Sequence, residues 1–218
     1  IEIVAKEEIM PRYADGDFGI KSDGSLQTPA DLAAQKKLEE LLQDVCPASF
    51  LGEEMTKKEQ MRLWESSREL IWCVDPIDGT SNYVNGIPYF AVSVALMKKG
   101  ETLLGAVYDP TRQEMFYAEK DGGAFLNGVK LSSPTKNRKL GQAMAQIDFK
   151  RLPKDIASEL LAHTPYASQR NFGAGALEWC YLASGRFDIY LHGSQKLWDY
   201  AAGSLILAES GGIARTID

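Results

Sequence analysis

The sequence has 218 residues, of which 44% are hydrophobic and 25% are charged, a balance typical of globular proteins that excludes a disordered chain. The formal net charge of −6 disfavours a nucleic acid polymer as partner, and no apolar run reaches the ~20 residues of a membrane helix. Three widely spaced cysteines indicate a reducing compartment. We therefore expect a cytoplasmic protein that binds neither membranes nor nucleic acid polymers.

Residues 1–138 are predicted to form an α+β lobe. An amphipathic helix is expected at residues 1–10. A second helix should begin at Thr28, which has the position of a capping residue, with proline next and Asp31 three positions after the cap. Residues 55–69 are expected to be a loop or an exposed helix. A short strand at 49–52 precedes five strands that should pair in succession as antiparallel neighbours, at 70–74, 90–97, 102–108, 114–118 and 124–126.

Residues 139–218 are predicted to form an α/β lobe in which helices and strands alternate. Helices are expected at 153–163, 174–184 and 200–209, and a strand is expected at 188–191. A helix already under way at residue 1 and a strand at 216–218 lead us to expect that the natural chain is longer at both ends.

The densest candidate site is the segment Asp-Pro-Ile-Asp-Gly-Thr at 75–80, directly after the apolar run 70–74. A strand this apolar should be buried on both faces, so its end brings Asp75 and Asp78 to one confined place. Two carboxylates repel each other there unless a cation lies between them. Oxygen ligands of this kind suit Mg²⁺ or Mn²⁺ rather than zinc.

Other residues of the segment support an ion and phosphate site. Pro76 bends the backbone and can turn the carbonyl oxygen of Ile77 toward the same point. Gly79 allows a tight turn whose amide could meet a phosphate oxygen, and Thr80 adds a hydroxyl. A solvated Asp-Gly turn after a strand is the alternative interpretation.

Two other phosphatase mechanisms are excluded. In the aspartyl-phosphatase motif D-x-D-G-T the nucleophilic carboxylate lies two residues before the second aspartate, and Pro76 occupies that position here. Cys180 and Arg186 have the C-x5-R spacing of cysteine phosphatases. Because Cys180 has helical spacing with Ala176 and Leu177, however, its thiol should belong to the core.

A second candidate cluster is Leu-Trp-Asp-Tyr-Ala-Ala-Gly at 197–203. Asp199 is expected at the start of a helix, where it could project a carboxylate or simply act as an ordinary N-cap. The small residues at 201–203 predict close packing of that helix against a neighbour.

Together these motifs resemble the inositol monophosphatase family of Mg²⁺-dependent, lithium-sensitive phosphatases. The resemblance covers nearly the whole chain and rests on segments in the family's order: Gly-Glu-Glu at 52–54, Asp-Pro-Ile-Asp-Gly-Thr-Ser-Asn-Tyr at 75–83, Trp-Asp-Tyr-Ala-Ala-Gly at 198–203 and Glu-Ser-Gly-Gly at 209–212. It implies a layered αβαβα sandwich of the sugar phosphatase type, within the α/β class, and a homodimer.

The resemblance also implies the metal ligands. Glu53, Asp75 and the carbonyl oxygen of Ile77 would hold one ion, and Asp75, Asp78 and Asp199 would hold a second. The family uses two or three Mg²⁺ ions, and Mn²⁺ is an alternative.

Further site residues follow from the same resemblance. Gly79 and Thr80 would contact the phosphate, and Lys21 is expected nearby. Glu53 and Thr80 would orient and deprotonate the attacking water, and Asp31 would form a hydrogen bond with the Thr80 hydroxyl. A helical residue that supports its own N-terminus is the compatible alternative for Asp31.

The substrate side departs from the family pattern. The family's Gly-Thr/Ser-Ala turn appears as Gly173, Ala174 and Gly175, without the hydroxyl that often faces the substrate. Seven residues before Asp199, inositol-preferring members have a glutamate that binds sugar hydroxyls, but this chain has His192. The metal site is therefore expected to be intact while the alcohol pocket differs. A surface position is the alternative for His192.

These residues predict the Mg²⁺-dependent hydrolysis of a small phosphate monoester, an inositol monophosphate-like polyol or sugar phosphate, by direct attack of an activated water. Fructose-1,6-bisphosphate and nucleotide 3′-phosphates are alternative substrates on the same scaffold. A non-catalytic, metal-binding regulatory protein is the alternative from another class. Retention of both Glu53 and Thr80 argues against it, because a protein without turnover has no chemical need for the pair.

Overall fold

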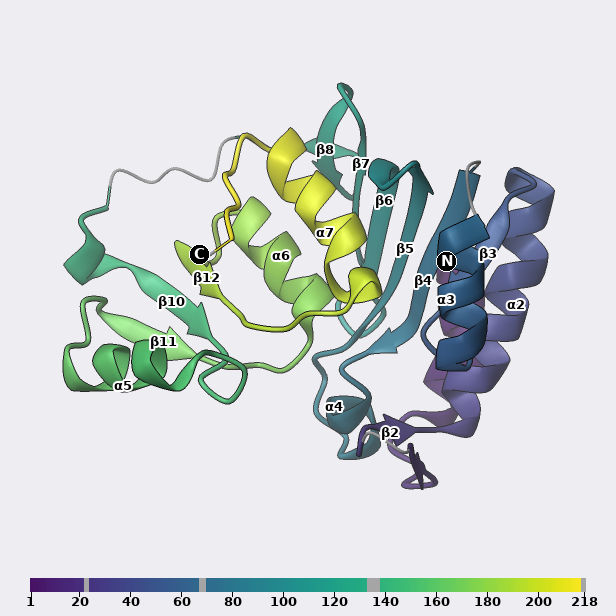
Figure 1. Cartoon of the computed structure of the whole chain (residues 1–218), viewed down its shortest axis with the longest axis horizontal. Coiled ribbons are helices and arrows are strands. Elements are labelled where there is room, and N and C mark those ends of the chain that lie inside the picture. The colour runs from purple at the N-terminus through teal and green to yellow at the C-terminus, as the bar shows by residue number, and fades with distance from the viewer. Residues whose placement is uncertain (22–23, 67–69, 133–137, 217–218) are drawn as a thin grey trace.

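Two sheets with helices between and outside them form five layers in the computed structural model, which describes residues 1–21, 24–66, 70–132 and 138–216 (Figure 1). Helices α6 (Gly175–Ala183) and α7 (Leu197–Glu209) lie between the sheets, α2 (Pro29–Val45) covers the outer face of the larger sheet, and α5 (Lys154–Ala162) covers the smaller one. This order of layers confirms the expected αβαβα sandwich of the α/β class.

Within the described residues, the larger sheet has seven strands in the order β3-β4-β5-β6-β7-β8-β9. Strand β3 is parallel to β4, and every later pair is antiparallel. The predicted succession of antiparallel strands is therefore confirmed. The strands are β3 (Ser49–Gly52), β4 (Leu70–Asp78), β5 (Ala91–Lys98), β6 (Glu101–Asp109), β7 (Glu114–Glu119), β8 (Gly123–Leu126) and β9 (Val129–Lys130).

Strand β4 runs four residues further than predicted and includes the acidic segment. Its pairing with β5 shifts in register between Asp75 and Asp78, because Pro76 cannot donate a hydrogen bond to the neighbouring strand. Most side chains of β4 are buried, because they alternate between the core under α2 and the core under α6 and α7. The acidic segment therefore ends a buried strand and is not a solvated turn.

In the part of the chain that the structure describes, the smaller sheet has three parallel strands in the order β11-β10-β12, namely β10 (Met144–Ile147), β11 (Ser168–Arg170) and β12 (Ile189–Leu191). Only β12 was expected from the sequence. Strand β11 is the polar tripeptide Ser-Gln-Arg, and β10 contains Gln146, so neither shows a strand pattern.

The helices largely confirm the prediction. Thr28 and Asp31 form the expected capping box of α2, and residues 55–69 contain the helix α3 (Lys57–Ser66). The first helix is irregular: α1 (Glu2–Val4) continues as a π-helix, η1 (Ala5–Ile9), and a 3₁₀ turn, η2 (Met10–Arg12). The remaining short elements are β1 (Gly19–Ile20), β2 (Leu26–Gln27), α4 (Thr80–Val84) and the 3₁₀ turn η3 (Leu140–Gln142).

The structure differs from two expectations about the C-terminal part. Helix α7 begins at Leu197, three residues earlier than predicted. No strand forms at Thr216, and residues 217–218 of that predicted strand lie outside the described part. The division into lobes after residue 138 stays a prediction, since α6 and α7 from the second lobe pack on the larger sheet of the first.

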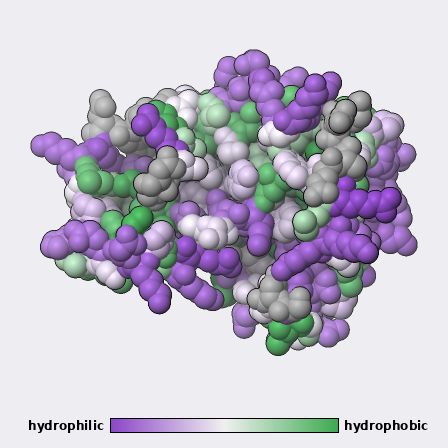
Figure 2. Space-filling view, viewed as in Figure 1, coloured by the Kyte–Doolittle hydropathy of each residue, from purple (hydrophilic) through white to green (hydrophobic). Residues whose placement is uncertain are grey.

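The surface agrees with this layered core. Hydrophilic residues cover most of the face shown in Figure 2, and hydrophobic residues form small separate patches on it. Among the described residues, no helix has the length and apolar character that crossing a membrane requires.

Candidate functional site

The structure brings together three aspartates from distant parts of the chain. Asp75 and Asp78 lie at the end of β4, and Asp199 lies in the first turn of α7. One carboxylate oxygen from each residue lies within 4.8 Å of the others. Helix α7 packs across the larger sheet, and the hydroxyl of Ser93 in β5 donates a hydrogen bond to the carbonyl oxygen of Trp198 at 3.0 Å. This contact holds the start of α7 against the strand next to β4.

Each of the three carboxylates accepts one hydrogen bond from a backbone amide, which fixes its orientation. A carboxylate held at one oxygen still has a second oxygen with which to bind a cation. The pairs are Asp75 Oδ1 with the Ile77 amide at 3.0 Å, Asp78 Oδ2 with the Ala176 amide at 2.6 Å, and Asp199 Oδ2 with the Lys196 amide at 2.8 Å.

The electrostatics of this cluster favour a bound cation. Burial raises the pKa of Asp75 and Asp78 well above the ordinary value, and neighbouring carboxylates raise it further. Burial likewise raises the pKa of Asp199 to about 6, although the hydrogen bond from Lys196 opposes the shift. A divalent cation would offset both the desolvation and the repulsion. The all-oxygen donor set therefore fits Mg²⁺ or Mn²⁺.

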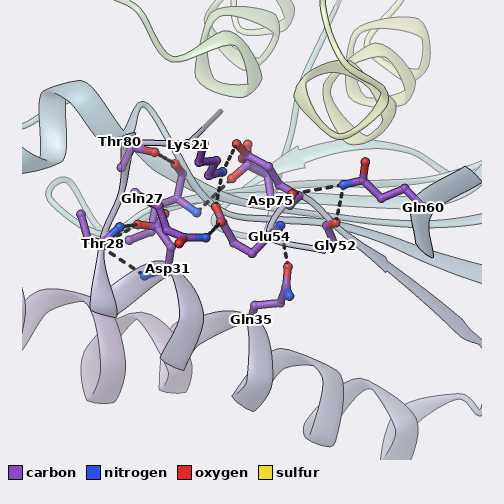
Figure 3. A network of polar contacts seen from close by, with 12 residues as sticks. Lys21, Gln27, Thr28, Asp31, Gln35, Gly52, Glu54, Gln60, Asp75 and Thr80 are labelled. Carbon is purple, nitrogen blue, oxygen red and sulfur yellow. Dashed lines mark hydrogen bonds and ion pairs between the residues drawn. The ribbon is translucent and has the colours of Figure 1, made fainter. Parts of the chain in front are cut away.

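Glu53 and Lys21 lie beside this cluster. The Glu53 amide donates to the carbonyl oxygen of Val74 at 3.0 Å, which places Glu53 next to the end of β4. The Lys21 ammonium lies 2.9 Å from Glu53 Oε1. It also lies 2.7 Å from Glu54 Oε1 (Figure 3). Burial opposes the charge of Lys21, but the two glutamates outweigh burial and raise its pKa. Lys21 thus supplies a cation at the edge of an acidic site.

Glu54 is a further part of the site. The sequence analysis includes it in the Gly-Glu-Glu motif but predicts no role for it. Its carboxylate is fully buried and accepts hydrogen bonds from Lys21 and Gln27, while its amide donates to Gln35 Oε1 at 2.9 Å (Figure 3). Burial raises the pKa of Glu54, although its hydrogen bonds with Lys21 and Gln27 oppose the shift. Glu54 therefore ties the β1–β2 hairpin to the end of β3 and holds Lys21 at the site.

The expected hydrogen bond between Asp31 and Thr80 is not formed. The Thr80 hydroxyl donates to the Ile77 carbonyl oxygen at 3.0 Å, whereas Asp31 Oδ2 accepts from the Thr28 amide at 2.7 Å and hydroxyl at 2.6 Å. The capping box turns Oδ2 of Asp31 toward its own helix, and Oδ1 is buried with no partner among the described residues. Burial raises the pKa of Asp31 to about 7. The structure thus shows the helix-supporting role of Asp31.

The predicted substrate-side turn lies directly against the end of β4. Gly79 has a φ of +92°, and a Cβ atom there would lie 3.0 Å from the Cβ of Ala174, so the position requires glycine. Asn82 Nδ2 donates to the carbonyl oxygens of Tyr89 and Phe172, both at 2.7 Å. The turn at 173–175 and the segment after β4 therefore form one wall of the site.

His192 follows β12 at the carboxyl end of the smaller sheet. Its Nε2 lies 3.6 Å from Asp148 Oδ2, and its side chain is 14% exposed, which argues against the surface alternative. Burial lowers the pKa of His192 and favours the neutral ring. The carboxyl end of parallel strands is where open α/β sheets bind ligands. The structure thus places His192 at this edge beside Asp148, and its contact with a substrate stays a prediction.

Cys180 is a core residue, as expected. Its side chain is fully buried on the inner face of α6, and burial raises the pKa of its thiol. A thiol that resists ionisation is a poor nucleophile. The position and the chemistry of Cys180 both agree with exclusion of the cysteine-phosphatase mechanism.

Comparison with known proteins agrees with the geometry. The sequence model of the inositol monophosphatase family matches residues 2–218. An inositol-1-monophosphatase of Caulobacter vibrioides is 36% identical over 205 residues, covering 91% of this chain and 78% of the relative. The Nus factor SuhB of Pasteurella multocida is 35% identical over 206 residues, covering 93% and 76%.

The solved structure of an IMPase of Thermotoga maritima superposes with a TM-score of 0.82 at 28% identity, covering 97% of this chain and 80% of that chain. A family match over almost every residue, the shared fold and the convergent aspartates lead to one conclusion. The chain belongs to the inositol monophosphatase family of phosphatases.

Proposed function

We propose that this protein hydrolyses a small phosphate monoester, an inositol monophosphate-like polyol or sugar phosphate, with the help of Mg²⁺. The observation that carries the proposal is the convergence of three carboxylates, two of them buried, within 4.8 Å. The solved structure of a staphylococcal IMPase-II with bound inositol monophosphate, 29% identical with a TM-score of 0.73, supports this substrate class. The departures at Ala174 and His192 make inositol itself one candidate among several.

The chain offers ligands for two or three ions, Mg²⁺ or alternatively Mn²⁺. Glu53, Asp75 and the Ile77 carbonyl oxygen would hold one, and Asp75 would share a second with Asp78 and Asp199. Ions bound there would neutralise phosphate charge and lower the pKa of a water molecule.

The side chains around this cluster have distinct roles in the proposed reaction. Glu53 accepts a proton from the attacking water. Thr80 donates its own hydrogen to Ile77, so its oxygen is left to accept a hydrogen bond from that water and to orient it. The Gly79 amide and the Lys21 ammonium bind phosphate oxygens, and both neutralise charge that develops in the transition state.

Direct attack by water, without a phosphoenzyme, is supported by the two positions that the other phosphatase mechanisms would need. Pro76 stands where a nucleophilic aspartate would be needed, and the Cys180 thiol is buried in the core with a raised pKa. Water is thus the group that attacks phosphorus opposite the leaving alcohol.

A screen of phosphate release tests the proposal. Inositol, sugar, histidinol and nucleotide phosphates, including fructose-1,6-bisphosphate and 3′-nucleotides, are assayed with Mg²⁺ and with EDTA. We expect release from a small polyol or sugar phosphate that EDTA abolishes. Preference for a bisphosphate or a nucleotide would move the function to the alternative substrates.

A regulatory role has one supporting observation, because a relative at 35% identity is called a Nus factor. A protein that binds Mg²⁺ in calorimetry and releases no phosphate from any ester in the screen would favour this role and overturn the proposal. We also propose that the protein is a cytoplasmic homodimer, which light scattering of the purified protein and fractionation of cells test.

A further inference from the structure

We propose that Glu178 is a positioning residue: its buried carboxylate fixes the loop 172–176 and, through that loop, the orientation of Asp78. The inference rests on the proposed function in one respect, since it takes Asp78 as a ligand of the bound ion. Glu178 lies in α6, is 2% exposed, and has no part in the reaction described above.

Hydrogen bonds from two sides hold the loop 172–176. Asn82 and Asp78 bind it from the site, and Glu178 binds it from α6 through the amides of Gly173 and Ala174, so the loop connects the site with Glu178. The bonds join Asn82 Nδ2 to the Phe172 carbonyl oxygen at 2.7 Å, the Gly173 amide to Glu178 Oε1 at 3.0 Å, and the Ala176 amide to Asp78 Oδ2 at 2.6 Å.

The start of α6 explains why this loop needs a carboxylate. The first amides of a helix have no partner within the helix, and a Ser, Thr, Asp or Asn side chain usually caps them. Ala174 occupies the capping position and provides no side-chain hydrogen bond. Glu178 reaches back to Gly173, which precedes the cap, and Asp78 accepts from Ala176 in the first turn. The Asp78 carboxylate thus takes the place of the missing cap, and the Glu178 carboxylate fixes the residue before it.

Glu178 is itself held firmly from another layer of the fold. Gln146, fully buried in β10 of the smaller sheet, donates a hydrogen bond from Nε2 to Glu178 Oε1 at 2.6 Å. A buried carboxylate is costly, and apolar residues of similar size often stabilise a core as well. Packing alone would favour an apolar residue at position 178. The hydrogen bond from the Gly173 amide explains why a glutamate stands there instead.

Removal of the carboxylate should therefore loosen the loop more than the helix. Ala176, Leu177 and Cys180 hold α6 in the core independently of Glu178. Without Glu178 the Gly173 amide loses its acceptor, and the Ala176 amide no longer points firmly at Asp78. Binding of Mg²⁺ and of substrate should weaken, while the fold persists.

Four variants of the full chain separate the effect of side-chain length at position 178 from the effect of its charge. Glu178→Ala removes the acceptor, Glu178→Asp keeps the charge but is one methylene too short for the Gly173 amide, and Glu178→Gln keeps the length and an acceptor oxygen. Cys180→Ala is the matched control, because it truncates a buried side chain of the same helix outside the loop. Calorimetry without substrate measures Mg²⁺ affinity, steady-state kinetics give kcat and KM, and thermal melting reports the fold.

We expect Glu178→Ala and Glu178→Asp to weaken Mg²⁺ binding by about tenfold, as loss of a group that orients a metal ligand does, and to raise KM more than they lower kcat. Glu178→Gln and Cys180→Ala should bind Mg²⁺ like the wild type. Wild-type affinity in a folded Glu178→Ala, or weakening in Glu178→Gln but not in Glu178→Asp, would overturn the proposal. If Glu178→Ala does not fold, the comparison of Asp with Gln still decides.

The failure of the proposed function is a separate result. A wild-type protein that releases no phosphate from any ester refutes the proposed hydrolysis. Mg²⁺ calorimetry on the four variants is unaffected by that outcome, because it uses no substrate. The role of Glu178 is then accepted or rejected on ion affinity alone.

Discussion

The Oδ2 atom of Asp78 accepts a hydrogen bond from the Ala176 amide at 2.6 Å, across 98 positions of sequence. Asp199 makes a similar contact with the Lys196 amide at the start of α7. Two helix N-termini, with their partial positive charge, therefore face the same group of carboxylates. The acidic cluster is stabilised by the docking of α6 and α7 on the larger sheet, so its geometry depends on contacts distant in sequence.

Asp75→Asn should abolish phosphate release while the protein stays folded. The neutral amide has the shape of the carboxylate and can still accept the hydrogen bond from the Ile77 amide, but it lacks the charge of a ligand proposed to bridge two ions. In EDTA the melting temperature of the variant should be no lower than that of the wild type, because one of the repelling carboxylates is gone. Turnover like that of the wild type at saturating Mg²⁺ would refute the metal assignment.

Thr80→Ala should slow turnover more than it weakens substrate binding. The hydroxyl is proposed to orient the attacking water, so its loss should lower kcat by about 10²-fold, the contribution typical of such groups, with a small change in KM. Thr80→Ser keeps the hydroxyl and is the matched control. Steady-state kinetics on the best ester of the screen decide. A tenfold rise in KM at constant kcat would make Thr80 a binding group only.

Cys180→Ser should retain most activity. The thiol is buried in α6 and has a raised pKa, and direct attack by water does not use it. The buried hydroxyl should lower stability by about 1–3 kcal/mol if it finds no partner. Activity and melting temperature are measured on the same sample. Lost activity with an unchanged melting transition would revive the cysteine-phosphatase mechanism.

Metal-free protein should be less stable at about pH 8 than at about pH 5. Burial raises the pKa of Asp31 to about 7 and that of Asp199 to about 6, above their values in the unfolded chain. The folded state therefore binds more protons than the unfolded state between roughly pH 4 and pH 7, and its stability falls as pH rises through that range.

Thermal melting in EDTA at both pH values checks this prediction. Asp31→Asn should reduce the difference, because one shifted group no longer titrates. Mg²⁺ should restore stability mainly at the higher pH, where Asp199 is ionised and able to bind it. Greater stability of the metal-free protein at pH 8 would contradict the prediction.

Local signals in the sequence were sufficient for much of the fold. The capping pattern at Thr28 and Asp31 predicts α2 because its interactions lie within four residues. Turn residues between apolar runs predict the antiparallel strands for the same reason. The sequence does not predict β10 and β11, because β11 is the polar tripeptide Ser-Gln-Arg and β10 contains Gln146, so neither has a strand pattern.

The site was predictable only in part. Asp75 and Asp78 follow a buried strand, so their proximity could be inferred from local pattern, whereas Asp199 alone reads as an ordinary helix start. Its place beside them depends on the packing of α7, which only the family resemblance anticipated. Glu178 has no sequence signal, because its function as an acceptor requires the turn at Gly173 to fold back on α6.

His192→Glu should change which alcohol is accepted without changing the dependence on Mg²⁺. His192 takes the place of the glutamate that binds ring hydroxyls in inositol-preferring members, and a neutral imidazole offers one donor and one acceptor where a carboxylate offers only acceptors. A site that pairs with a hydroxyl discriminates strongly, whereas a lost apolar contact costs only ~1–3 kcal/mol. The ratio of kcat/KM values should therefore move toward inositol monophosphate.

Asp148 complicates a simple exchange, because its Oδ2 lies 3.6 Å from His192 Nε2 and would repel a new carboxylate. His192→Glu is therefore compared with the double variant that adds Asp148→Asn, and with His192→Gln as the uncharged control. A competition between inositol monophosphate and the best ester of the screen gives the ratio for each protein. The shift should be largest in the double variant, since the new carboxylate there has no charged neighbour at position 148. An identical ratio in all four proteins would place His192 outside the pocket and would contradict the prediction that this residue selects the alcohol.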